Sequence, residues 1–271
     1  MRLDRSTVAG GAGRALVAVL ALLLLLFILL PLVALVLRTT PATLAASLGQ
    51  PAATSALSLS LETTAVSLFL ALLLGTPAAY LLARRRFPGK RLLDSLVDLP
   101  IVLPPAVAGV ALLVAFGRFG LFAAPLNLVG VHLSFSTAAV VLAQLFVASP
   151  FYIRSARAGF SGVDRALEDA SATLGYSGWG TFRRVTVPLA LPSLLGGAVL
   201  TWARALGEFG ATILFAGNLQ GVTQTMPLAI YETLEGNGDI DGAASLSVLL
   251  VIASLVVLLV VRLFGERAVS D

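Results

Sequence analysis

The chain has 271 residues, of which 58% are hydrophobic and 12% are charged. About a quarter of the residues of a soluble domain are charged, so this composition excludes a soluble globular protein and indicates an integral membrane protein embedded in lipid. The net charge of +4 does not indicate nucleic-acid binding, because the basic residues lie between apolar runs rather than on one surface beside base-reading side chains.

The first two predicted elements are membrane-spanning helices. Residues 15–37 form an apolar run of 23 residues, which is longer than the roughly 7–15 residues of a signal peptide, and Arg2, Arg5 and Arg14 precede it. Residues 38–56, rich in Thr, Ser, Ala and Pro, predict an exposed connector, and residues 57–83 predict the second helix. Five basic residues then lie in 84–91, where a short loop between two spans sets the orientation of the chain in the membrane.

The third and fourth predicted spans each carry an unusual feature. The third, residues 99–116, opens with Pro100, Pro104 and Pro105, which remove backbone donors and predict a bent helix beside a cavity. Residues 117–134 predict an outer connector. The fourth span, residues 135–153, has Gln144 near its middle, which is interpreted as a bridge to a neighbouring helix, with a contact to a transported substrate as the alternative.

A polar island follows at residues 160–192 and overlaps a predicted loop at residues 154–188. Asp164 is a candidate N-cap and Gly175 stands where a chain leaves a helix in the left-handed conformation, so a short helix is predicted between them. Val163, Leu167, Ala170 and Leu174 recur at helical spacing and are expected to share one face, while Arg165, Glu168 and Asp169 point elsewhere. The pattern predicts a short amphipathic helix at the membrane boundary.

The last predicted spans cover residues 189–216 and 243–264. Six spans place both termini on one side. Fifteen of the 18 Lys and Arg residues then share that side, Arg38 and Arg118 lie on the other, and Arg204 lies within a span. The positive-inside rule therefore predicts cytoplasmic termini and a cytoplasmic polar island.

Arg204 and Glu208 lie four residues apart, on one face of the fifth predicted span. Each charge alone near the bilayer centre costs about 2.5–3.5 kcal/mol, so the two are expected to face the bundle interior and to neutralise each other. The alternative is that Arg204 also lends positive potential to an anion path, with Glu208 setting its orientation.

The sequence offers no catalytic or metal site. It has no Walker A pattern, no Ser-His-Asp set and no cysteine, and the lone His132 is interpreted as a loop residue. Residues 237–242 resemble the start of a calcium loop, but its twelfth position would be Val248, which cannot ligate. Because the chain has no Walker A pattern, any energy from ATP hydrolysis would have to come from another subunit.

The polar island carries a family resemblance. Glu168, Asp169 and Ala170, then Gly175, then Val185, Val187 and Pro188 resemble the EAA motif of importer-type ABC permeases, with Asp169 in place of the middle alanine. The resemblance implies a coupling helix that docks into a cytoplasmic ABC ATPase. The implied coupling residues are Val163, Leu167, Glu168, Asp169, Ala170, Leu174 and Gly175.

A second resemblance covers residues 204–231. Arg204 to Thr212, Phe215 to Asn218, Thr223 to Thr225 and Pro227 to Tyr231 look like the fifth-helix signature of molybdate permeases, and sulfate permeases share the core 204–211. The start of the third span is similar to the same permeases. The resemblance implies a homodimer, two ATPase subunits that bind ATP and Mg, and an extracytoplasmic oxyanion-binding protein.

These resemblances also imply roles for particular residues. Pro227, Tyr231 and Glu232 would contact the binding protein, with a helix capping the bundle as the alternative. Gln144, Arg204 and Glu208 would lie along the translocation pathway. No cofactor is expected in this chain.

The sequence thus predicts an all-α integral membrane protein with the type I ABC importer permease fold. Residues 1–55 would form the N-terminal helix and its connector, residues 56–264 a five-helix core, and residues 265–271 a cytoplasmic tail. The expected function is the permease subunit, not an enzyme, of a molybdate or tungstate importer in a prokaryotic inner membrane. The alternatives are a sulfate or thiosulfate permease, an ATP-independent secondary transporter, which would show internal repeats, and a structural scaffold.

Overall fold

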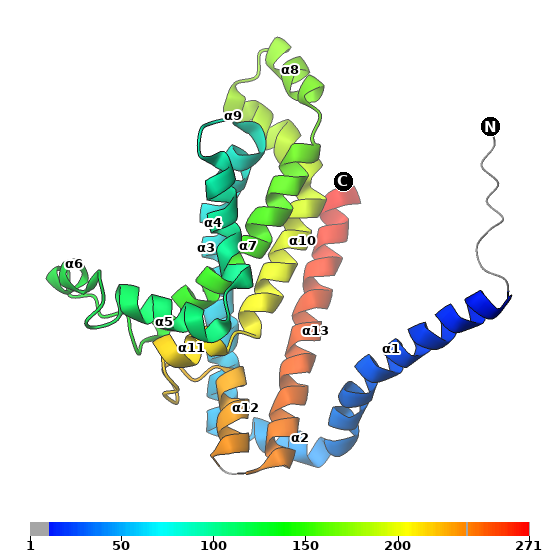
Figure 1. Ribbon diagram of the computed structural model, residues 1–271, viewed down its shortest axis with the longest axis vertical. Coiled ribbons are helices and arrows are strands. Elements are labelled where there is room, and N and C mark those ends of the chain that lie inside the picture. The colour runs from blue at the N-terminus through cyan, green and yellow to red at the C-terminus, as the bar shows by residue number, and fades with distance from the viewer. Residues whose placement is uncertain (1–10, 237, 271) are drawn as a thin grey trace.

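The computed structural model describes residues 11–236 and 238–270, and in that part of the chain all regular elements are helices (Figure 1). Five of them are long and apolar enough to cross a membrane, and a pair bent by 115° gives a sixth if the pair is counted as one broken span. The predicted all-helical membrane architecture is confirmed, with five to six candidate spans. Arg2 and Arg5, which entered the charge count, lie outside the described residues.

The elements follow one another along the chain with short connections. They are α1 (Gly11–Arg38), α2 (Pro41–Leu48), α3 (Pro51–Arg84), α4 (Lys90–Val102), α5 (Pro105–Phe116), α6 (Ala123–Leu128), α7 (Thr137–Gly162), α8 (Arg165–Thr173), α9 (Gly178–Thr181), a π-helical turn η1 (Phe182–Thr186), α10 (Val187–Leu206), α11 (Gly210–Phe215), α12 (Met226–Glu235) and α13 (Ile240–Ser270).

The centre of the bundle is formed by α3, α7 and α10, with α13 beside α10 (Figure 1). Small residues let α7 and α10 approach closely, because a Cβ atom on Gly197 would lie 2.7 Å from the Cβ of Ser155, and one on Gly159 would lie 2.6 Å from that of Ser193. Ser155 also donates a hydrogen bond of 2.7 Å to the carbonyl of Ser193. Close backbone packing therefore contributes to the contact between α7 and α10.

The bundle has two distinct ends (Figure 1). One, here called the α8 end, carries α8, α9 and the connection between α3 and α4. The other, the α12 end, carries α2, α12 and the start of α13. This arrangement places the basic loop 84–91 beside the polar island, as the sequence predicted.

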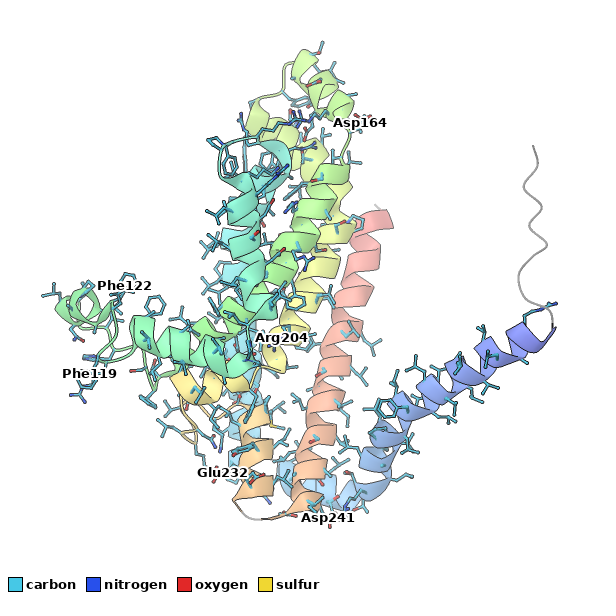
Figure 2. All side chains as sticks on the ribbon, viewed as in Figure 1. Phe119, Phe122, Asp164, Arg204, Glu232 and Asp241 are labelled. Carbon is cyan, nitrogen blue, oxygen red and sulfur yellow. The ribbon has the colours of Figure 1, made fainter. Side chains whose placement is uncertain are left out.

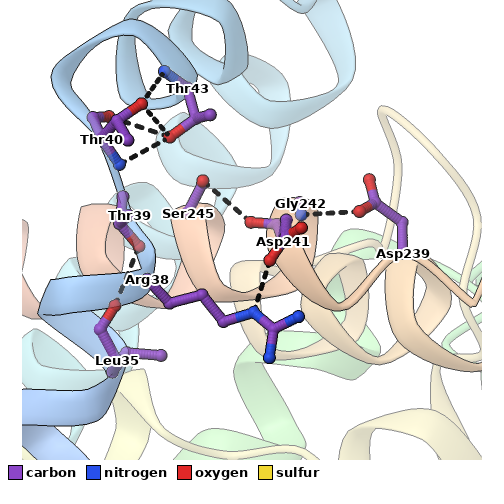
Figure 3. Close-up of polar contacts among 9 residues, drawn as sticks. All are labelled: Leu35, Arg38, Thr39, Thr40, Thr43, Asp239, Asp241, Gly242 and Ser245. Carbon is purple, nitrogen blue, oxygen red and sulfur yellow. Dashed lines mark hydrogen bonds and ion pairs between the residues drawn. The ribbon is translucent and has the colours of Figure 1, made fainter.

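The N-terminal helix α1 leans away from the bundle, and its most apolar segment is fully exposed. Arg38 at its end forms an ion pair with Asp241 at the start of α13 (Figure 3). The connector predicted at residues 38–56 is largely exposed, but most of it is helical. Thr40 and Thr43 make a capping box that starts α2, and a proline at the first position starts α3 six residues before the predicted boundary.

The third crossing differs from its predicted bounds. Its first helix, α4, begins at Lys90 rather than at residue 99. Ion pairs from Asp94 and Asp98 to Arg157 and Arg154 attach α4 to α7. The helix breaks at residues 103 and 104, both extended because each precedes a proline, and α5 leaves at 115°.

Three other boundaries also needed correction. Helix α7 continues to Gly162, so the polar loop begins about nine residues later than predicted. The fifth span already starts at Gly178, and α10 ends at Leu206 rather than at residue 216. The predicted tail is helical as far as Ser270, because α13 continues beyond the apolar span; Asp271 lies outside the described residues.

Candidate functional site

The polar island forms the predicted short helix, α8. Asp164 accepts a hydrogen bond of 3.0 Å from the backbone N–H of Ala166 and so caps its first turn. The chain leaves through Gly175, whose φ of +88° is readily available only to glycine, and a Cβ atom there would meet nothing within 4 Å. The cap and the exit predicted from the sequence are both confirmed.

Glu168 ties α8 to the bundle. Its Oε1 accepts from the Nη2 of Arg84 at 2.9 Å and from the Oγ1 of Thr186 at 2.6 Å. Arg84 also donates to the backbone carbonyl of Val163. The carboxylate thus joins α8 to the end of α3 and to the turn η1, and Arg84 connects the same site to the residue that follows α7. The motif placed Glu168 on α8, but neither partner followed from the sequence.

The outer face of α8 remains uncovered. Leu167 and Ala170 are exposed, and the side chain of Leu174 is 79% exposed. Asp169 is exposed as well, but its position in the helix places it on another side. The expectation that Val163 shares this face is wrong, because Val163 ends α7 and packs in the core beside Phe160.

Trp179 on α9 is also exposed, at 71%, and its ring stacks on that of Phe182 at 5.4 Å. The sequence reading missed this residue. Its signal was a large aromatic side chain inside the polar island, five residues beyond Leu174.

Two broken helices meet inside the bundle. A Cβ atom on Gly210 at the start of α11 would lie 2.5 Å from the Cβ of Pro105 at the start of α5. A Cβ atom on Gly109 would lie 3.0 Å from the Cα of Ala211. The break between α4 and α5 therefore lies against the break between α10 and α11. We call this contact the break junction.

Arg204 and Glu208 lie at the break junction. The Nη2 of Arg204 is 2.8 Å from the Oε2 of Glu208, so the predicted pairing is confirmed, as an ion pair rather than an aligned hydrogen bond. Glu208 lies in the turn after α10, not on a continuous helix, and its Oε1 accepts from the backbone N–H of Ala211 at 2.8 Å. The Glu208 side chain is fully buried, whereas that of Arg204 is 30% exposed. The Arg204 side chain is therefore partly accessible, whereas the carboxylate that balances its charge is buried.

Gln144 bridges α7 to α3. Its Nε2 donates to the Oγ1 of Thr63 at 3.2 Å, and its Oε1 accepts from the Oγ of Ser67 at 3.0 Å. The side chain is buried, so the helix-bridging interpretation is confirmed. Each of its polar atoms already has a protein partner, and its burial keeps it from a substrate in this arrangement.

Helix α12 places Pro227, Tyr231 and Glu232 at the end of the bundle opposite α8. Figure 2 shows Asp164 and Glu232 at opposite ends, with Arg204 between them. Pro227 is half-buried in the first turn, Tyr231 is exposed and packs against the ring of Phe209 at 5.1 Å, and Glu232 accepts from Asn218. The helix covers part of the bundle and also presents an exposed face.

The sequence was compared with known proteins. Residues 71–269 match the family model described as binding-protein-dependent transport system inner membrane component. The molybdenum transport system permease protein ModB of Mycobacterium tuberculosis is 48% identical over 209 residues, covering 77% of this chain and 78% of that protein. The protein of the same name from Escherichia coli is 41% identical over 215 residues, covering 78% and 94%.

The fold has solved counterparts. A chain in the crystal structure of a bacterial alginate ABC transporter, bound to its pentasaccharide-loaded periplasmic protein, superposes with a TM-score of 0.79. The match covers 94% of each chain at 15% sequence identity, so it shows a shared fold and nothing more.

Proposed function

The chain belongs to the family of binding-protein-dependent transport system inner membrane components, and on that premise we propose how it works in an ATP-driven importer. It is a multi-pass inner-membrane transport subunit, not an enzyme. ATP and its Mg²⁺ would be bound by separate subunits on the cytoplasmic side. The feature that carries the proposal is α8, which stands clear of the bundle with an uncovered face while Glu168 holds it to α3 and to the turn η1.

The proposed cargo is molybdate or the closely similar tungstate. Relatives named for molybdenum transport share 41–48% of their residues with this chain over more than three quarters of its length. Arg204 supports an anionic cargo, because a guanidinium offers N–H donors to oxyanions and this one is partly accessible.

The proposed partners lie at opposite ends. The α8 end would face the cytoplasm, where Leu167, Leu174 and Trp179 dock into the ATPase. The α12 end would face outward, where Tyr231 and Glu232 contact an oxyanion-binding protein. The structure of the similar alginate transporter holds a periplasmic protein that is bound to an alginate pentasaccharide. Two copies of the chain would surround one pathway.

A mechanical route from α8 to the break junction runs through named contacts. ATP binding would draw the two α8 helices of a dimer together. Because Glu168 bonds to Arg84 and to Thr186, a displacement of α8 pulls on α3 and on the start of the helix that continues as α10. Helix α10 ends two residues after Arg204, so its tilt moves the ion pair and the break junction with it.

Docking is tested by placing a charge on the uncovered face. Leu174→Glu is expected to abolish co-purification of the ATPase, because a carboxylate would have to be buried at the interface. Leu128→Glu is the matched control, since Leu128 is also exposed but lies on α6, away from α8. Equal recovery of the ATPase with both variants would refute docking through α8.

Orientation is tested by cysteine labelling, because the chain has no cysteine of its own. In intact cells, a membrane-impermeant maleimide should label Glu235→Cys at the α12 end and leave Arg165→Cys at the α8 end unlabelled. The reverse pattern would place α8 outside the reach of a cytoplasmic ATPase and end the proposal.

Cargo is tested by competition. Uptake of radiolabelled molybdate by proteoliposomes holding the complete transporter should be inhibited by tungstate at concentrations where sulfate has no effect. Inhibition by sulfate at similar concentrations would favour a sulfate permease, whose signature shares residues 204–211.

A further inference from the structure

The guanidinium of Arg204 is only partly used by the protein. It carries five N–H donors in a planar fork. Within the described residues, its one charged partner is Glu208, and it donates no hydrogen bond to any other protein group. Its side chain is 30% exposed, so the remaining donors are accessible at the break junction. One edge of the guanidinium can therefore stay with Glu208 while another receives an oxyanion.

Glu208 is held independently of Arg204. Its Oε1 accepts from the backbone N–H of Ala211, and its side chain is fully buried against the break junction. This second contact fixes the carboxylate in place when the donors of Arg204 change partners. A carboxylate held beside a cationic contact repels any anion that approaches the same cation, and the repulsion is strong where water is scarce.

A pathway must hold its ion weakly enough to release it. An unpaired guanidinium at the edge of the bilayer core would attract a divalent oxyanion strongly. The fixed carboxylate reduces the formal charge of the site from +1 to zero and opposes the bound anion. If the ion pair served only to stabilise the fold, the other N–H donors of Arg204 would not need to be accessible.

We propose that Glu208 is the release-determining residue of a transient oxyanion site on Arg204. The ligand is a divalent tetrahedral oxyanion, held by the free N–H groups of Arg204, and the carboxylate of Glu208 keeps that binding weak. This inference rests on the proposed function, because it takes the cargo to be an oxyanion that crosses the break junction.

The test removes the charge and keeps the hydrogen bond. In Glu208→Gln the amide oxygen can still accept from Ala211, so the turn is retained while the repulsion is lost. Glu62→Gln is the matched control, because Glu62 is an exposed glutamate on α3 outside the break junction. Arg204→Gln combined with Glu208→Gln removes the anion-binding group as well.

Two measurements are made on the complete transporter. Tungstate binding to the solubilised complex, freed of its binding protein, is measured by equilibrium dialysis, and maximal molybdate uptake is measured in proteoliposomes. Glu208→Gln is expected to tighten tungstate binding about tenfold and to lower maximal uptake several-fold, because release becomes slow. The Glu62→Gln control should match the wild type, and the double variant should lose the gain in binding.

Unchanged tungstate binding by a Glu208→Gln complex that assembles normally would overturn the inference. If that variant does not assemble, Glu208→Asp decides, since its shorter side chain draws the charge away from Arg204 and should tighten binding about two- to threefold. No tightening in Glu208→Asp would equally overturn the inference. A wild type that imports neither molybdate nor tungstate would instead refute the proposed function.

Discussion

The ion pair between Arg84 and Glu168 should be a strong energetic tie between α8 and the bundle. The two side chains are 9% and 17% exposed, and their closest N–O distance is 2.9 Å. We expect Arg84→Met and Glu168→Gln each to destabilise the protein, and the double variant to lose much less than the sum. The reason is that either single change leaves one charged or polar group poorly compensated, whereas the double change removes both.

The magnitude follows from burial. Removing one partner of a fully buried pair costs about 3–5 kcal/mol. Water reaches part of Glu168, so the lower value of about 2–3 kcal/mol is expected for each single variant. The coupling energy of the double-mutant cycle should then be about 2 kcal/mol. The free energy of unfolding would be followed in mixed micelles titrated with SDS.

A matched pair lies at the other end of the bundle. Arg38 and Asp241 also form an ion pair, but their side chains are 55% and 64% exposed. Their cycle should give a coupling energy below about 1 kcal/mol. Equal coupling energies for the two cycles, or additive effects of Arg84→Met and Glu168→Gln, would refute the argument that Glu168 secures α8. Binding-protein-stimulated ATPase activity should fall in both single variants at the α8 end.

Three further predictions concern single positions. Gly175→Val should uncouple ATPase activity from uptake, while Gly175→Asn should retain most of the coupling. The reason is that a β-branched residue is strained at a φ of +88°, whereas asparagine tolerates this conformation. Equal coupling in the two variants would contradict this prediction. Gln144→Leu should lower the free energy of unfolding by about 1 kcal/mol and leave molybdate uptake intact, because the two hydrogen bonds of Gln144 join α7 to α3. Loss of uptake in a stable variant would show instead that Gln144 acts in the translocation pathway. Gly197→Ala should lower the free energy of unfolding by about 1–3 kcal/mol, because the methyl group of the alanine would lie 2.7 Å from the Cβ of Ser155. Gly196→Ala is the control and should be near neutral, because a Cβ atom there meets nothing within 4 Å. The two variants are compared by thermal shift on purified protein.

Several features of α8 could be predicted because they depend on neighbours in the sequence. Capping by Asp164 and the exit at Gly175 depend only on residues within a turn or two. Val163 was misplaced for the opposite reason. Its helical spacing to Leu167 was correct, but α7 runs on to Gly162, and its packing in the bundle buries Val163.

Helix boundaries were missed where contacts between distant segments decide them. The early turns of α4 are stabilised by ion pairs from Asp94 and Asp98 to arginines on α7. Those arginines lie about 60 residues away in the sequence, so the local pattern does not predict the pairs. The end of α10 at Leu206 likewise depends on how the following turn packs against α5.

The sequence by itself determined that the chain is an all-helical membrane protein, roughly where its apolar segments lie, and where a short polar helix interrupts them. Hydropathy, capping and turn residues act over a few positions, so they can be recognised without a structure. Only the tertiary structure decided that Glu168 meets Arg84, 84 positions away, and that two helix breaks face each other around Arg204 and Glu208. Those contacts depend on which helices pack together and at what depth, and the order of residues along a single helix does not contain that information.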